Sequence, residues 1–308
     1  MNGLVRNQRG QSLVLAVVAL VSLLGMAALV LDVGSWYRAK RSLQSSADAA
    51  ALAGAQALPD APSSGTSLAQ TYATKNVPDL ATKDVSVSSN IVPNDRITVH
   101  VTRPSPGFFA KLLGVDSVQV GATATAQSEG MAQARYVAPI TVRNTHPMLA
   151  GPGCPCYGPD NETSIPLGKN GAPGSFAMLD LTGDSTGTTG ASTLADWIVN
   201  GYDHYLPLGG YYSDPGAKFN NSQILAALNQ RVGTELLFPV YDTLTSGGSN
   251  ATYHIIAWAA FHLESVETQG TGGSITGYFT DIVWDGVPAT TPGGGGPNLG
   301  VHTVQLVD

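Results

Sequence analysis

The residues of this chain best suited to chemistry are its two cysteines, Cys154 and Cys156, which are separated only by Pro155. Residues two apart can bring their Cα atoms within the distance of about 7 Å that a disulfide requires. The spacing leaves three outcomes open: a small structural disulfide, a bridge to another molecule, or a reducible redox pair. We favour the structural disulfide.

Histidines and carboxylates also recur at spacings that invite a metal-site interpretation. His254 and His262 lie eight residues apart in a stretch with strand periodicity. That separation is about 26 Å along a strand, too far for one metal ion to bridge. Two pairs of aspartates lack the pattern of a calcium-binding loop, and we expect them at polar turn ends: Asp180 with Asp184, and Asp281 with Asp285.

Sequence signatures of common enzymes are missing as well. The chain contains no HExxH motif, no Gly-x-Ser-x-Gly motif and no phosphate-binding P-loop. We therefore predict no catalytic residue, no cofactor and no metal, and interpret the chain as a protein that is not an enzyme.

Near the amino terminus the sequence becomes strongly apolar. Residues 12–31 carry no charge, and as a helix they span about 30 Å, the thickness of the hydrocarbon core of a bilayer. Trp36 and Tyr37 follow at the position of the headgroup layer. The run is longer than the apolar region of a cleaved signal peptide, so we predict a single-pass, uncleaved transmembrane helix with residues 1–11 in the cytoplasm.

Helical periodicity continues beyond the apolar run, over residues 32–58. One face of this segment repeats at helical spacing, and we predict it to be a helix-packing face: Leu43, Ala47, Ala50 and Gly54. Two explanations for its small residues remain open. Alanine is the best helix former, and small side chains also let neighbouring helices approach closely.

The amino-terminal motifs resemble a known family. Arg9-Gly10-Gln11-Ser12 leads into the apolar run, Asp32-Val33-Gly34 ends it, and the sequence ADAAALAGA occupies residues 47–55. Over about residues 5–58 this resembles the amino-terminal module of TadG-like (TadE/TadG group) proteins of bacterial Tad, or Flp, pilus assembly. The resemblance implies a membrane-anchored, pilin-like protein whose partners are the lipid bilayer and other pilin-like or Tad components, with self-association into a homo-oligomer left open.

One position departs from the pilin-like pattern. Such precursors are cut after a glycine and carry a glutamate five residues into the mature chain. Cleavage after Gly10 would place Leu15 at that position. Processing by a prepilin peptidase is therefore not expected, and the helix stays attached as an anchor.

Charge is distributed unevenly along the chain. Residues 1–143 have a net charge of +4, whereas residues 144–308 have a net charge of −11 and contain only three lysines and arginines. An acidic domain of this kind is a poor partner for nucleic acid, which requires clustered cations. We place this acidic part outside the cytoplasm, where its charge keeps it soluble and where its cysteines can oxidise.

The rest of the sequence predicts two domains, which together with the long helix make an α+β protein. Residues 66–143 predict a small α+β domain in the order helix, strand, strand, helix, strand. Its two helices, around Leu68 and over residues 108–113, are expected to cover one face of the sheet.

Residues 144–308 predict a mostly antiparallel β domain rich in Gly and Pro. Helices are expected over residues 194–199 and 223–232, the latter capped by Ser222. Strands are expected over residues 176–181, 235–241, 252–267, 275–284 and 301–307, and Gly293–Gly296 is interpreted as a loop.

These observations support one function and one alternative. The first is a non-enzymatic, membrane-anchored protein of the bacterial cell envelope that takes part in assembly or display of a Tad/Flp-type pilus. The alternative is a cell-surface adhesin whose acidic half binds a glycan or protein through exposed aromatic residues. The candidates for that role are Trp197, Tyr202, Tyr205, Tyr211, Tyr212, Trp258 and Trp284.

Overall fold

The computed structural model divides the chain into two compact units, one of residues 1–127 with 305–308 and one of residues 128–304. The structure describes residues 9–168, 178–183, 189–214, 219, 221–245, 251–269, 272–291 and 294–307. Each unit has its own core, and each is described separately below.

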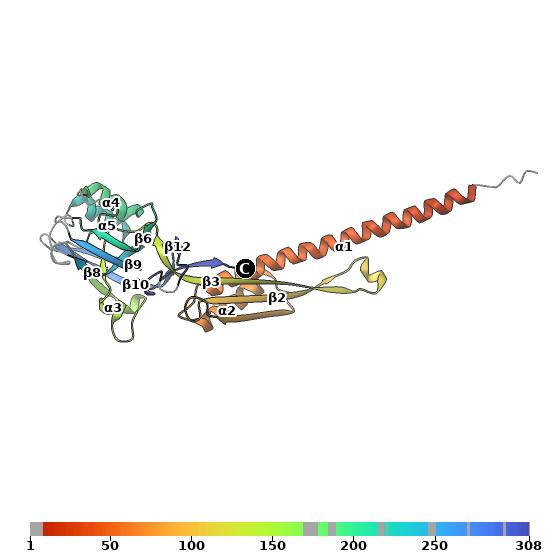
Figure 1. The fold of residues 1–308 in the computed structure, drawn as a ribbon, viewed down its shortest axis with the longest axis horizontal. Coiled ribbons are helices and arrows are strands. Elements are labelled where there is room, and N and C mark those ends of the chain that lie inside the picture. Colours follow the sequence, from red (N-terminus) through yellow and green to blue (C-terminus); the bar gives the residue numbers. More distant parts are fainter. Residues whose placement is uncertain are drawn as a thin grey trace, which may run out of the picture. The chain divides into compact units, whose positions relative to one another are not determined.

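The first unit is built from two helices and an antiparallel sheet (Figure 1). Its elements are α1 (Arg9–Ala55), α2 (Pro62–Asn76), β1 (Thr82–Ser88), β2 (Arg96–Pro106), the short 3-10 helix η1 (Ala110–Leu113) and the start of β3 (Ser117–Ala134). Strand β2 lies between β1 and β3. The predicted order of elements in this domain is confirmed.

The core of the first unit lies between the sheet and the helices α1 and α2. Every second residue of β2 points inward, and Ile97, Val99 and Val101 are fully buried. Both α1 and α2 pack on β2 and on one another. The prediction that a second helix, over residues 108–113, covers the sheet is wrong, because Leu112 and Leu113 of η1 are 83% and 86% exposed. The outer half of α1 covers the sheet instead.

The second unit contains most of the strands. Its short elements are β4 (Val142–Arg143), α3 (Pro147–Ala150), η2 (Pro159–Asn161), β6 (Leu206–Pro207), β7 (Gly209–Tyr212), β11 (Ile282–Val283) and β12 (Gly286–Pro288). Its longer elements are β5 (Thr163–Gly168), α4 (Ala191–Asn200), α5 (Ser222–Arg231), β8 (Glu235–Thr245), β9 (Thr252–Gln269), β10 (Gly272–Thr280) and β13 (Val301–Leu306).

The main sheet of this unit runs in the order β4-β8-β9-β10-β5, with β7 also paired to β9. The β8–β9, β9–β10 and β10–β5 pairs are antiparallel, whereas β4 is parallel to β8. Helices α4 and α5 pack together, and α5 also contacts β9 (Figure 1). The predicted α+β class with a mostly antiparallel carboxy-terminal part is confirmed.

Strand β9 forms the centre of the second core. One face of this strand, including Tyr253, Ile255 and Phe261, is almost completely buried. Phe238 stacks on Phe261, and Phe279 meets the same ring edge-on. On the opposite face Trp258 is also buried, so the middle of β9 is covered on both sides.

The unit boundary differs from the one that composition suggested. The charge change placed it at 143/144, whereas the compact units meet at 127/128. Met131, Val137 and Ile140 belong to the hydrophobic core of the second unit. The side chains that a segment packs against decide its unit, and composition carries no information about them.

Helix α2, expected around Leu68, runs over Pro62–Asn76. The predicted capping residue of α5 is wrong. The side chain that caps α5 belongs to Asn221 and accepts from the Gln223 amide, so Ser222 is the first helical residue. Parts of two predictions lie outside the described residues: 176–177 of the first expected strand, and Gly293.

Candidate functional site

Helix α1 changes its environment along its length. From residue 12 to residue 31 its side chains are largely exposed, as illustrated by Leu13, Leu24 and Val30 at 68%, 61% and 70%. This part is long and apolar enough to cross a membrane. Since exposed aliphatic side chains are unfavourable in water, the length and composition of this half suit a lipid environment.

The outer half of α1 is built into the core of the first unit. All four residues of the predicted packing face are buried: Leu43, Ala47, Ala50 and Gly54. Close approach to neighbouring helices was one of the two explanations left open above for the small residues of this face. In the structure, α2 and β2 of the same chain occupy it.

Two glycines bring α1 and α2 into close contact. A Cβ at Gly54 would lie 2.8 Å from the carbonyl oxygen of Gly65 and 2.7 Å from Cδ1 of Ile97. A Cβ at Gly65 would in turn lie 2.7 Å from the carbonyl oxygen of Gly54. The backbones therefore touch where any side chain would separate the helices.

Asp32 fastens the turn between β2 and β3 to α1. Its Oδ1 accepts from the Phe108 amide at 2.8 Å, its Oδ2 accepts from the Ala110 amide at 2.6 Å, and both oxygens accept from the Phe109 amide. The side chain is buried, which by itself would raise its pKa, but the three amide donors outweigh this effect and lower the pKa of Asp32. The carboxylate is thus held in its charged form.

Further polar contacts follow along α1. The Trp36 indole donates to the carbonyl of Pro106 at 3.3 Å, the Lys40 ammonium donates to the carbonyl of Gly121, and the Gln44 amide donates to the carbonyl of Thr123. These donors lie four residues apart, on one line of the helix. They fix the rotation of α1 relative to the sheet of the first unit.

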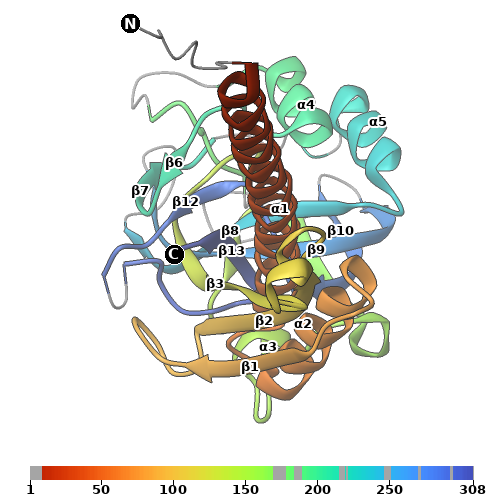
Figure 2. The same cartoon turned by 90° about the vertical axis from the view of Figure 1, so that its right-hand side faces the viewer.

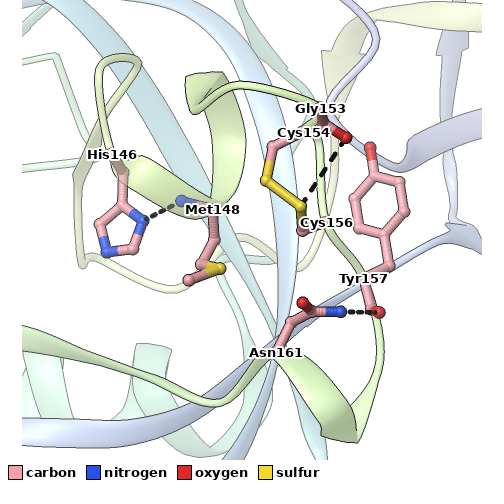
Figure 3. The surroundings of a disulfide bond; sticks show 7 residues. All are labelled: His146, Met148, Gly153, Cys154, Cys156, Tyr157 and Asn161. Carbon is pink, nitrogen blue, oxygen red and sulfur yellow. Dashed lines mark hydrogen bonds between the residues drawn. A yellow bond between two sulfur atoms is a disulfide. The ribbon is translucent and has the colours of Figure 1, made fainter.

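The two cysteines lie in the second unit, after α3, and are joined in a disulfide with a Cα–Cα distance of 4.5 Å (Figure 3). The Cys156 amide also donates to the carbonyl of Met148. Both sulfurs are paired within the chain in this structure, a geometry that fits a structural disulfide and also the oxidised form of a reducible pair.

Thiol labelling tests this pairing directly. In the oxidised full-length chain we expect no maleimide to attach until a reductant is added, after which both cysteines should react. The Cys154→Ser variant should instead give one reactive thiol without reduction. Labelling of both wild-type thiols in the absence of reductant would contradict the disulfide.

Each strand histidine of the second unit faces a carboxylate. His254 lies 2.8 Å from Asp242, and His262 lies 3.0 Å from Glu235 on the neighbouring strand β8. Hydrogen bonding to His254 is the largest influence on Asp242 and lowers its pKa. Sequence spacing could not reveal these pairs, because they depend on the register between two strands.

Three aspartates of the two pairs considered above contact other side chains. Asp180 accepts from the amide and hydroxyl of Thr182, Asp281 lies 3.5 Å from His302, and Asp285 lies near Arg135. Asp184 lies outside the described residues. Within the described part of the chain, no group of three His, Cys, Asp or Glu side chains could hold a metal ion.

His146 lies directly before α3 and caps its first turn. Its Nδ1 accepts from the Met148 amide at 3.2 Å, which requires an unprotonated nitrogen (Figure 3). Burial lowers the pKa of His146 below its ordinary value of 6.5. The unfolded chain therefore takes up the proton first as the pH falls.

We expect stability to decrease as the pH falls below about 6.5, and the decrease to level off below the folded-state pKa. The measurement is the thermal midpoint of the full-length chain across this range. His146→Asn keeps an acceptor but does not titrate. Its thermal midpoint should therefore fall less with pH than that of the wild type, by a few degrees. An identical pH dependence in both proteins would exclude His146 as its source.

The aromatic residues considered for adhesion are mostly used internally. Trp197, Tyr211 and Trp258 are 7%, 7% and 3% exposed, and the Trp258 indole donates to the carbonyl of Met131. Tyr205 is the most exposed of the set at 45%. The three buried side chains therefore serve packing, and the set does not support the adhesin alternative.

Two functional features escaped sequence reasoning. One is the carboxylate of Asp32 bound to a turn 76 to 78 residues away in sequence, and the other is the contact between Gly54 and Gly65. The sequence did contain a partial signal for the first, an aspartate at the end of an apolar run, but its partners are backbone amides, which every sequence has.

Comparisons with known proteins bear on the amino-terminal part of the chain. No curated protein and no solved structure shows a significant match. A family model matches residues 10–57, which covers the apolar half of α1, Asp32 and the buried outer face. This confirms the resemblance: the amino-terminal module of the chain matches the family "Putative Flp pilus-assembly TadE/G-like".

Proposed function

We propose that this chain is a non-enzymatic, membrane-anchored protein that takes part in assembly or display of a Flp-type pilus. The observation that carries the proposal is the division of α1, whose first half exposes an uninterrupted apolar surface while its second half forms part of a folded core. The match of the same helix to a TadE/G-like pilus-assembly model supports the assignment.

Because the packing face on the outer half of α1 is buried, partner subunits would have to contact a different part of the helix. Since α2 and β2 already cover Leu43, Ala47 and Gly54, other pilin-like subunits would contact the exposed apolar half of α1 within the bilayer. Small residues such as Ala19 and Gly25 on that half allow close helix approach. The outer half then joins the folded unit directly to the membrane-length half of the same helix.

We further propose that the globular part lies outside the cytoplasm. Its support is the acidic, cation-poor composition of residues 144–308 and the disulfide between Cys154 and Cys156. Protease added to intact spheroplasts should then remove the second unit. Full protection in sealed cells, followed by digestion after lysis, would contradict this orientation.

Loss of the chain tests the assembly role. Cells that lack it should produce far fewer surface pili, and the wild-type chain should restore them. The informative variant replaces residues 12–31 with an unrelated apolar helix of equal length, which preserves anchoring while removing specific helix contacts. We expect this variant in the membrane fraction without restored piliation; normal pilus output in cells without the chain would reject the role.

A further inference from the structure

The turn between β2 and β3, residues 107–116, exposes a cluster of large apolar side chains. Phe108 is 67% exposed, Leu112 and Leu113 are 83% and 86% exposed, and Phe109 and Val115 are each 42% exposed. In water such a cluster is unfavourable and marks an interaction surface. We call residues 107–116 the apolar turn.

The apolar turn lies beside the apolar half of α1. Leu112 and Leu113 line one groove, of about 820 Å³, together with Val21, Leu24 and Leu29 of the helix. Figure 2, viewed from the amino-terminal side of α1, shows this yellow turn next to the helix, and Figure 1 shows the same neighbourhood from the side. The two surfaces therefore form one continuous apolar region.

The turn is held in place and is not a free loop. Hydrogen bonds from three backbone amides to the Asp32 carboxylate fix residues 108–110 of the turn, and the Trp36 indole donates to the last residue of strand β2. Gly114 ends η1 with a left-handed φ of 84°, a conformation that glycine adopts without strain. Its exposed side chains are thus presented at a fixed position along α1.

The apolar turn lies level with the part of α1 that is proposed to cross the membrane. Leu24 precedes the end of the apolar run at residue 31 by seven residues, about 10 Å along a helix. A groove that reaches Leu24 therefore extends below the level where α1 leaves the hydrocarbon. Trp36 also lines the groove and lies beyond the end of the apolar run, where aromatic residues meet headgroups.

We propose that the apolar turn inserts into the leaflet from which α1 emerges and is a second membrane contact of the first unit. This inference rests on the proposed anchoring by α1 and adds a lipid-binding surface to it. The occupant favoured is lipid, because the exposed Leu112 and Leu113 continue the apolar surface of α1 across one groove. A helix of another protein in the groove is the competing outcome.

Insertion would restrict the first unit to one orientation on the membrane. A transmembrane helix alone leaves its attached domain free to rotate and tilt, whereas a second contact beside it defines a plane. Asp32 is the positioning residue in this arrangement, since it holds the turn without exposing its own charge to lipid.

Nitroxide accessibility in the full-length chain tests the proposal. A spin label is placed at Leu113→Cys in a Cys154→Ser/Cys156→Ser background, and the protein is reconstituted into phosphatidylethanolamine and phosphatidylglycerol vesicles. Leu24→Cys is the lipid reference and Leu68→Cys on α2 is the water-exposed control. We expect the ratio of oxygen to nickel-chelate collisions at position 113 to resemble position 24 and to exceed position 68 several-fold.

The Asp32→Asn exchange should lower that ratio at position 113 and leave it unchanged at position 24. A water-like ratio at 113 together with a lipid-like ratio at 24 would overturn the insertion while preserving the anchor. Low collision rates with both reagents at 113 would indicate coverage by protein and overturn lipid as the occupant. A water-like ratio at position 24 would overturn the anchor and the insertion together.

Discussion

Replacing Gly54 with leucine is expected to separate α2 from α1 and to destabilise the first unit. The new Cβ alone would lie within 3 Å of the Gly65 carbonyl oxygen, Ile97 Cδ1 and Ala69 Cβ. The carbonyl belongs to the backbone and cannot rotate away as a side chain could. Overpacking of this kind destabilises by about 1–3 kcal/mol for added methylenes, and leucine adds more volume than the lower end of that range represents.

The expected loss is a large part of what holds the unit together. Small domains have net stabilities at the low end of about 5–15 kcal/mol. We therefore expect Gly54→Leu to expose the amides of α2 to rapid hydrogen exchange in the detergent-solubilised full-length chain, while the apolar half of α1 remains helical. Gly54→Ala should also raise the hydrogen-exchange rates of the α2 amides, but by less.

Gly34→Leu is the matched control for this prediction. It makes the same chemical change in the same helix, but a Cβ at Gly34 meets none of the described atoms within 4 Å. Its stability should be equal to wild type or higher by up to about 1 kcal/mol, from helix propensity. Unchanged exchange in α2 of the Gly54→Leu protein would show that the helices can move apart without loss of the fold.

Exchange of Asp32 for asparagine is expected to release the turn between β2 and β3. The variant keeps one acceptor oxygen but replaces the other by an amide group, which is itself a donor and faces the Phe109 amide together with that of either Phe108 or Ala110. Bonds to a charged acceptor are also stronger than bonds to a neutral one. The hydrogen-exchange rates of these amides should rise by about tenfold or more.

The pH dependence of the turn has a definite sign. Because the folded-state pKa of Asp32 lies below its ordinary value of 3.8, the stabilisation is fully present above that value and is lost as the pH falls through the folded-state pKa.

Asp48→Asn is the control for the Asp32→Asn exchange, since Asp48 lies on the same helix and accepts from Gln44. Equal exchange at residues 108–110 in both variants would contradict the role of Asp32.

Several elements were accessible from sequence because their signals are local. The uncharged run of residues 12–31 and the ADAAALAGA motif predict the long helix and the family, and both predictions are confirmed. Alternating residues such as Ile97 and Val99 predict the inward face of β2, which is buried as expected. These patterns repeat at the period of one helix or strand, so they need no knowledge of a partner.

Other features depended on which segments meet. The face of Leu43, Ala47 and Gly54 was correctly identified as a packing surface, but its occupant is the same chain. The turn around Leu112 has a helical, apolar composition that suggests a core element, yet its side chains are exposed beside the membrane-length helix. Identical residue patterns suit a core, a membrane or a neighbouring subunit.

Periodicity and composition were thus sufficient for the membrane-length helix and most of the secondary structure, and the amino-terminal motifs were sufficient for the resemblance that the family model confirms. Only the tertiary structure decided that the emerging helix belongs to a core, that Asp32 holds a distant turn, and that Gly54 opposes Gly65. The physical reason is that hydrophobic burial has no direction and no preferred partner. Close packing and hydrogen-bond geometry choose the partner, and they exist only once the chain has folded.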